Sequence, residues 1–203
     1  GNMKFSRFEM MRTAARIMRY HTMPPIHRQT VGEHTFGVLT IILEVESFPS
    51  SELLRAALYH DATEALLGDT PSPAKWFAAS LEGALKVSEE SIKKAYAIDI
   101  NLSEHDKMIL KYADLMELVV FCLEEADDGN RKMLEPARDC LRAIEARGLR
   151  MCTPEANRLW THMNIRSQAY DNRVITHYRT THARPSYDLG VVSDDKDPNY
   201  DGE

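Results

Sequence analysis

Apolar residues recur along most of this sequence at spacings of three and four, the spacing that places side chains on one face of an α-helix. Segments that alternate apolar and polar residues, which would predict half-buried strands, are nearly absent. Hydrophobic residues make up 43% of the 203 positions, enough for a sizeable core. The sequence therefore predicts an all-α protein built as a single-domain helical bundle.

Capping residues and helix breakers predict where these helices begin and end. Ser6 and Thr30 are each followed three residues later by glutamate, the spacing of a capping box, and Ser103 is a further capping residue. The predicted helices span residues 6–20, 30–46, 51–67, 81–97, 103–126 and 133–146, and a last one begins at residue 154. We expect the domain to occupy residues 3–180. Residues 181–203 are rich in Pro, Asp, Gly, Ser and Tyr without an apolar period, and they predict a flexible polar tail.

Composition argues against several classes of partner. The net charge of −6 disfavours a nucleic-acid polymer, because such a binder needs a basic face to displace counterions. No apolar run approaches the roughly 18 residues that predict a membrane-spanning helix. The three cysteines are an odd number without paired spacing, which is typical of reduced thiols in a cytoplasmic protein. We therefore expect a cytoplasmic protein that does not bind a membrane.

The segment from Tyr59 to Asp69 concentrates polar chemistry within a helical apolar pattern. It carries one imidazole, His60, and three carboxylates, those of Asp61, Glu64 and Asp69. The His-Asp pair alone is weak evidence, because chance gives about half an occurrence in a chain of this composition. Neutral imidazole and carboxylate together nevertheless suit a divalent ion of borderline hardness. A metal site here requires further ligands from other helices.

His34 and Asp114 are the further candidates, each in an apolar helical setting. With His60 and Asp61 they supply two imidazoles and two carboxylates, which can half-enclose one divalent ion and leave positions open for water and substrate. Taken singly, His34 also fits a surface or hydrogen-bonded core histidine. Asp114 fits a salt bridge to a lysine or arginine, with Lys111 and Arg138 as the candidates. Four such residues on three separate segments favour the metal site.

The order of these residues resembles a known superfamily. His34, then His60-Asp61, then Asp114 is similar to the H…HD…D order of the all-helical HD-domain metal-dependent phosphohydrolases. The segments around them more closely resemble the HD-domain 5′-deoxynucleotidases over about residues 12 to 150. The segments that carry this closer resemblance are Glu33-His34-Thr35, Tyr59 to Glu64, Gly68 to Lys75 and Leu123-Glu124-Glu125.

The resemblance implies that the protein hydrolyses deoxyribonucleoside 5′-monophosphates to deoxynucleoside and phosphate. It implies one divalent transition-metal ion (Co, Mn, Fe, Ni or Zn) held by the four candidate ligands, and a homodimer. Glu64, one turn beyond the His-Asp pair, would orient or deprotonate the attacking water, or handle the proton of the leaving group.

The resemblance also implies roles for residues that would bind the nucleotide. Arg19 would hold the phosphate, Asp69 would accept the sugar 3′-hydroxyl, and Tyr20 would crowd the 2′ position. Lys75 would add positive charge near the phosphate. Three of them have a plainer interpretation: Arg19 as an exposed helix-end arginine, Asp69 as a turn residue and Lys75 as a solvated lysine. Two features depart from the family: Tyr20 stands where relatives have tryptophan, and the segment from Lys75 to Asp114 is shorter than usual.

Two alternatives remain open at this stage. The same metal site suits an HD-domain phosphohydrolase that acts on another nucleotide, such as a cyclic nucleotide, a dNTP or an alarmone. A different class is a non-catalytic helical binding module that a metal stabilises and that uses its tail for interaction.

Overall fold

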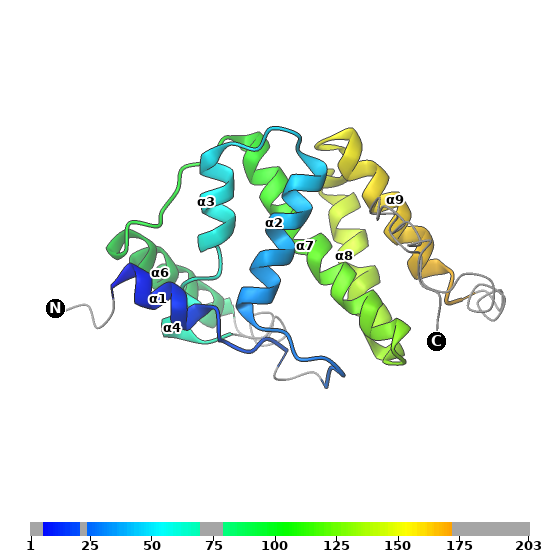
Figure 1. The fold of residues 1–203 in the computed structure, drawn as a ribbon, viewed down its shortest axis with the longest axis horizontal. Helices are drawn as coiled ribbons and strands as arrows, with labels where there is room; N and C mark the ends of the chain where they lie inside the picture. Colours follow the sequence, from blue (N-terminus) through cyan, green and yellow to red (C-terminus); the bar gives the residue numbers. More distant parts are fainter. Residues whose placement is uncertain (1–5, 21–23, 70–78, 172–203) are drawn as a thin grey trace, which may run out of the picture. The chain divides into compact units, whose positions relative to one another are not determined.

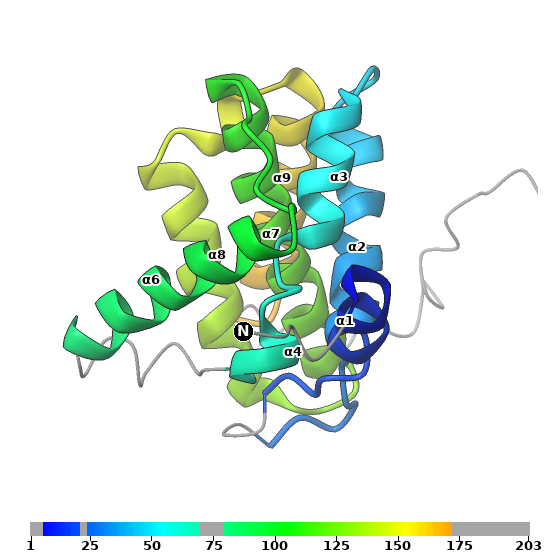
Figure 2. The same cartoon turned by 90° about the vertical axis from the view of Figure 1, so that its left-hand side faces the viewer.

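The computed structural model describes residues 6–20, 24–69 and 79–171, and every regular element within them is helical. Residues 1–167 form one compact unit and residues 168–203 a second, of which 168–171 are described. The elements in chain order (Figures 1 and 2) are α1 (Arg7–Ala14), α2 (Val31–Val45), α3 (Ser51–Tyr59), α4 (Glu64–Leu67), α6 (Ala79–Ala95), α7 (Glu104–Asp127), η1 (Arg131–Met133), α8 (Leu134–Ala146), η2 (Leu149–Met151) and α9 (Pro154–Gln168). The predicted all-α class is confirmed. None of the described helices combines the length and apolarity needed to cross a membrane.

Helix α7 is the central element of the first unit. It packs against α2, α3 and α8, and Figure 1 shows it running between α2 and α8. Fully buried side chains lie along its whole length, among them Ile109, Met116 and Leu123. A helix that is apolar on most sides belongs in a core rather than on a surface. This buried helix carries Asp114, so the predicted ligand is held on a rigid support.

Most helix starts lie where the sequence predicts them. Ser6, Thr30 and Ser103 each accept a hydrogen bond from the backbone N–H three residues on, and the first two form complete capping boxes. Thr153 caps α9 in the same way, accepting from Ala156 N at 3.0 Å. These bonds satisfy backbone donors that have no partner within the helix.

The first predicted helix ends six residues early, at Ala14 rather than Tyr20. The backbone beyond it instead pairs with the segment before α2: Arg19 N donates to Gln29 O at 2.9 Å, and Met18 and Thr30 form an isolated antiparallel bridge. Tyr20 then takes a left-handed conformation with φ +58°. Long-range pairing overrides local helix propensity here. As a result, Arg19 lies beside α2 instead of at a helix end.

The predicted continuous helix through His60-Asp61 is also wrong. Helix α3 ends at Tyr59, and residues 60–63 form turns in which Ala62 N donates to Tyr59 O and Glu64 N to Asp61 O. Helix α4 then ends at Leu67, and Gly68 after it adopts φ +72°. Consecutive residues of a regular α-helix point in different directions. The interruption lets His60 and Asp61, although adjacent, approach one point.

Gly32 supports the close approach of α2 to the segment after α1. A Cβ built there would lie 2.9 Å from Ala15 O and 3.2 Å from Ala15 Cβ, both atoms of the neighbouring segment. We expect Gly32→Ala to lower the free energy of unfolding by about 1–3 kcal/mol, because overpacking outweighs the gain in helix propensity. Urea unfolding followed by circular dichroism measures this. Gly83→Ala in α6, where a Cβ meets open space, is the matched control and should be neutral or stabilising. An unchanged midpoint for Gly32→Ala would contradict the prediction.

Candidate active site

The donor atoms of the four predicted ligands lie close together. His34 Nε2 is 3.2 Å from both His60 Nε2 and Asp114 Oδ1, and His60 Nε2 is 3.2 Å from Asp61 Oδ2. The wider separations are 3.6 Å between His34 Nε2 and Asp61 Oδ2, and 3.9 Å between His60 Nε2 and Asp114 Oδ1. Two donors about 2.1 Å from one transition-metal ion lie roughly 3.0–3.4 Å apart at tetrahedral or octahedral angles. Three of the five separations fall in this range. His34, His60 and Asp61, whose donor atoms all lie within 4.8 Å of one another, could hold one divalent ion, and Asp114 lies within 3.9 Å of both imidazole nitrogens.

The second nitrogen of each imidazole shows why a cation suits this place. His60 Nδ1 lies 2.6 Å from the carbonyl oxygen of Ala57, and His34 Nδ1 contacts the carboxylate of Glu117. Both partners are acceptors, so both Nδ1 atoms carry hydrogen and both Nε2 atoms present lone pairs when the rings are neutral. The two Nε2 atoms then lie less than 4 Å from each other and from both carboxylate oxygens. Such a cluster is repulsive without a cation between its members.

Asp114 both forms a salt bridge and faces the candidate metal site, the two interpretations that its sequence context allowed. Its Oδ2 accepts from Lys111 Nζ at 3.1 Å, while its Oδ1 faces the imidazoles. Arg138, the other predicted partner, donates to the carbonyl oxygen of Ser167 at 2.8 Å. Thus the salt bridge is present, and it leaves one carboxylate oxygen directed at the cluster.

The pKa values reflect this crowding. Burial lowers the pKa of His60, but the charge of Asp61 and its hydrogen bond outweigh burial and raise it to about 9. Burial also lowers the pKa of His34, but its hydrogen bonds to Asp114 and Glu117 outweigh burial and raise the pKa above its ordinary value. Burial raises the pKa of Asp114, yet the imidazoles and Lys111 hold it well below its usual range. In the absence of metal, protons on the imidazoles supply the positive charge that the carboxylates require.

Stability should therefore depend on pH in opposite directions with and without metal. The folded-state pKa of His60 lies above its ordinary value of 6.5, so the metal-free native state binds more protons than the unfolded chain between pH 6.5 and about 9. We expect the metal-free protein to lose up to about 3 kcal/mol as pH rises through that window. The protein saturated with Zn²⁺ or Co²⁺ should gain stability over the same window, because metal binding requires deprotonated imidazoles. Thermal unfolding from pH 6 to 9.5 with chelator or with metal measures both slopes, and parallel slopes would contradict this.

Glu64 lies at the start of α4, three residues beyond Asp61. Its Oε2 is buried and has no hydrogen-bond partner among the described residues. Burial raises the pKa of Glu64 to about 8, and the charges of Asp61 and Asp69 add to the rise. A carboxyl group with such a pKa can hold or release a proton near neutral pH.

Arg19 and Tyr20 adjoin the cluster. Arg19 Nη1 lies 3.4 Å from Asp61 Oδ2, and its side chain is only 15% exposed, so the interpretation as an exposed helix-end arginine is wrong. The ring of Tyr20 stacks on Phe121, with centroids 4.9 Å apart and planes at 1°. The Tyr20 hydroxyl is buried without a hydrogen-bond partner in the described part of the chain.

For Asp69 and Lys75, the other two residues predicted to contact the nucleotide, the structure gives less information. Asp69 ends the described segment after α4, near enough for its charge to affect Glu64. Lys75 lies outside the described residues.

Glu117 is the one residue at the cluster that sequence reasoning missed. It is buried on α7, contacts His34 Nδ1 and accepts from Gln29 Nε2 at 2.6 Å. The signal was present in the sequence, because Glu117 follows Asp114 by three residues and so shares its helix face.

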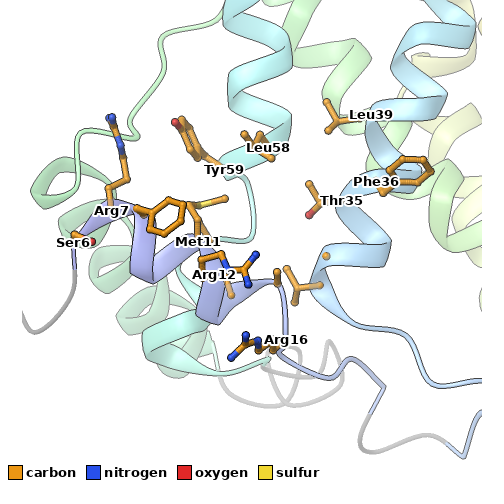
Figure 3. A pocket seen from close by; sticks show the side chains of 16 residues that line it. Ser6, Arg7, Met11, Arg12, Arg16, Thr35, Phe36, Leu39, Leu58 and Tyr59 are labelled. Atoms are coloured by element: carbon orange, nitrogen blue, oxygen red, sulfur yellow. The ribbon is translucent and has the colours of Figure 1, made fainter.

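A separate groove of about 830 Å³ opens between α1, α2 and α3 (Figure 3). Its walls are mainly apolar, including Met11, Phe36 and Leu58, and arginines of the α1 segment stand along it. None of the four candidate ligands lines this groove. This groove is therefore separate from the cluster of imidazoles and carboxylates.

Comparison with known proteins identifies the family. Residues 6–162 match the family described as 5′-deoxynucleotidase YfbR-like. A 5′-deoxynucleotidase of Enterobacter sp. strain 638 is 25% identical over 155 residues, covering 64% of this chain and 78% of that protein. A 5′-deoxynucleotidase of Erwinia tasmaniensis is 28% identical over 142 residues, covering 58% of this chain and 72% of that protein.

The fold comparison agrees. The HD phosphohydrolase DatZ of cyanophage S-2L, solved with dA and one catalytic Zn²⁺, superposes with a TM-score of 0.61. The match covers 82% of this chain and 99% of that protein at 17% identity, so it speaks for the fold alone. The resemblance stated from the sequence and the predicted HD-domain fold are both confirmed. The chain belongs to the 5′-deoxynucleotidase YfbR-like family, and it is a metal-dependent phosphohydrolase.

Proposed function

We propose that the protein hydrolyses deoxyribonucleoside 5′-monophosphates to deoxynucleoside and phosphate. The observation that carries the proposal is the convergence of two imidazole lone pairs and two carboxylate oxygens, with Arg19 and Glu64 beside them. The relatives named 5′-deoxynucleotidases, and the DatZ structure with its deoxynucleoside and zinc ion, support this substrate class.

The donor set suits one divalent transition-metal ion from the group Co, Mn, Fe, Ni and Zn, held by His34, His60, Asp61 and Asp114. When bound, such an ion lowers the pKa of a coordinated water and offsets the negative charge of the phosphate. The mixed nitrogen and oxygen donors make Mg²⁺ and Ca²⁺ poor candidates, because these ions prefer oxygen ligands.

Two side chains would act on the substrate at this site. Arg19 would bind phosphate oxygens, and its bond to Asp61 at 3.4 Å already holds the guanidinium at the edge of the cluster. Glu64 would transfer a proton, either from the attacking water or to the leaving 5′-oxygen. The pKa of about 8 makes both protonation states of Glu64 accessible near neutral pH.

Sugar recognition would come from Asp69 and Tyr20. Asp69 would accept the 3′-hydroxyl, and Tyr20 would exclude a 2′-hydroxyl by crowding. Stacking on Phe121 and a left-handed backbone both restrain the tyrosine ring, which supports a steric role. Lys75 would add positive charge near the phosphate.

A panel of metals and substrates tests the proposal. Metal-stripped protein reloaded with Co²⁺, Mn²⁺, Zn²⁺ or Mg²⁺ is assayed with dNMPs, NMPs, dNTPs, cyclic nucleotides and an alarmone, with released phosphate and nucleoside as readouts. We expect dNMPs to be hydrolysed fastest, and stripping to abolish turnover until a transition metal is restored. Faster hydrolysis of another substrate would assign that activity instead. Metal binding without hydrolysis of any substrate would favour the binding-module alternative.

Three further expectations remain predictions: a homodimer, a cytoplasmic location and a domain boundary at residue 180, which lies outside the described residues. Light scattering coupled to gel filtration over a range of concentrations tests the homodimer.

A further inference from the structure

We infer that Glu117 is a positioning residue that fixes the orientation of His34 for metal binding, with Gly37 and Gln29 completing its support. The inference rests on the proposed function, because it concerns the same metal site. The proposed mechanism gives no role to this buried carboxylate. The inference predicts that its loss measurably weakens metal binding.

The contacts of Glu117 account for both of its oxygens. Oε2 contacts His34 Nδ1, and Oε1 accepts from Gln29 Nε2 at 2.6 Å. His34 is fully buried and Glu117 nearly so, so water does not compete for these bonds. The carboxylate therefore holds the hydrogen of His34 on Nδ1 and leaves Nε2 as the donor atom. A negative charge bonded to the far nitrogen also makes Nε2 a stronger ligand.

The packing of α2 against α7 is arranged around this contact. Asp114 and Glu117 lie three residues apart on α7, and His34 and Gly37 lie three residues apart on α2, so each pair shares a helix face. A Cβ built on Gly37 would lie 2.7 Å from Glu117 Cγ and 3.1 Å from its Oε1. A larger residue at position 37 would thus push the carboxylate from its place. One face of α7 presents both a ligand and the group that orients the opposing ligand.

A purely structural interpretation makes a different prediction. If Glu117 only satisfies a buried histidine, its loss should lower stability and leave the intrinsic metal affinity unchanged. Metal affinity and the tautomer of His34, rather than activity, therefore separate the two interpretations.

Three variants test the inference. Glu117→Met removes the acceptor at similar volume, and we expect a 10–100-fold weaker affinity for Zn²⁺ or Co²⁺ in competition with a chromophoric chelator. Glu117→Gln keeps one acceptor oxygen for His34 and removes the charge, so its loss should be smaller. Gly37→Ala changes neither ligand nor charge, and by displacing Glu117 it should also weaken metal binding. In the zinc-loaded wild type, ¹⁵N shifts should report a single His34 tautomer, and in Glu117→Met they should change.

Matched controls separate positioning from general damage to the core. Glu125→Gln alters another fully buried carboxylate of α7, one that accepts from the backbone of Ile26 and His27, both at 2.6 Å, rather than from a ligand imidazole. It should lower stability and leave metal affinity unchanged. Gly83→Ala, at an open position in α6, is the control for Gly37→Ala.

The possible failures are distinguishable. Wild-type metal affinity in both Glu117→Met and Gly37→Ala, or an equal loss in Glu125→Gln, would overturn the positioning role while leaving dNMP hydrolysis by the wild type in place. If Glu117→Met does not fold, Gly37→Ala and Glu117→Gln decide. Absence of metal binding in the wild type would instead overturn the proposed function itself, and the positioning role with it.

Discussion

Replacing His60 with alanine is expected to lower kcat/KM for a deoxynucleoside monophosphate by at least about a thousandfold, or roughly 4 kcal/mol of transition-state stabilisation. The imidazole faces His34 Nε2 and Asp61 Oδ2, both at 3.2 Å, so its removal opens the centre of the cluster. His60 lies in the turn after α3, outside any regular helix, so helical content should be preserved. Released phosphate and far-ultraviolet circular dichroism measure the two effects.

Metal content must be measured alongside activity in this variant. We expect His60→Ala to retain little metal, and Asp61→Ala to behave similarly, since both remove a candidate ligand. His105→Ala is the matched control, because His105 is an exposed histidine at the start of α7 whose imidazole contacts Glu46 at 3.1 Å. Wild-type turnover in either metal-loaded ligand variant would remove this site from the proposed mechanism.

Local signals in the sequence predicted much of the fold. The capping residues Ser6, Thr30 and Ser103 begin helices where expected, because a capping bond involves only neighbouring residues. Capping residues do not predict where a helix ends because its backbone pairs with a segment distant in the sequence. Thus the early end of α1 at Ala14 depends on Gln29 and Thr30, residues distant in sequence that bond to the backbone of residues 18 and 19.

The candidate ligands were predictable because imidazole and carboxylate are rare in apolar helical settings. Their orientation was not predictable in the same way. The break after Tyr59 allows His60 and Asp61 to converge, and it appears only in the turn bonds of residues 60–63. Glu117 was not predicted as a site residue because a glutamate on a helix is usually solvent-exposed. The burial of Glu117 depends on the space that Gly37 leaves on another helix.

Glu64→Gln is expected to reduce kcat for dNMP hydrolysis by about 10²–10⁴-fold, the range typical of a lost general acid or base. Glu64 is not among the donor atoms that converge between His34 and His60, so we expect near wild-type metal affinity. The amide keeps the shape of the side chain and removes its ability to transfer a proton. A steady-state assay on protein with verified metal content measures the loss, and Glu44→Gln, at an exposed position of α2, is the control.

The pH dependence of this variant provides a second readout that does not involve catalysis. The folded-state pKa of Glu64 is about 8, against an ordinary value of 4.5, so between these two pH values the metal-free native state keeps a proton that the unfolded chain loses. Wild-type stability should therefore fall as pH rises from 4.5 to 8, and Glu64→Gln should lack this part of the decline. The variant should thus gain stability relative to wild type as pH increases.

The two readouts together determine the role of Glu64. A bound cation near Asp61 favours the ionised form of Glu64, so in the metal-loaded enzyme we expect its pKa below 8. If Glu64 acts as a base, wild-type activity falls below that pKa, and if it acts as an acid, activity falls above it. Glu64→Gln should abolish the corresponding limb of the pH profile in either case. Retention of that limb, with unchanged kcat, would show that the buried carboxyl group takes no part in proton transfer.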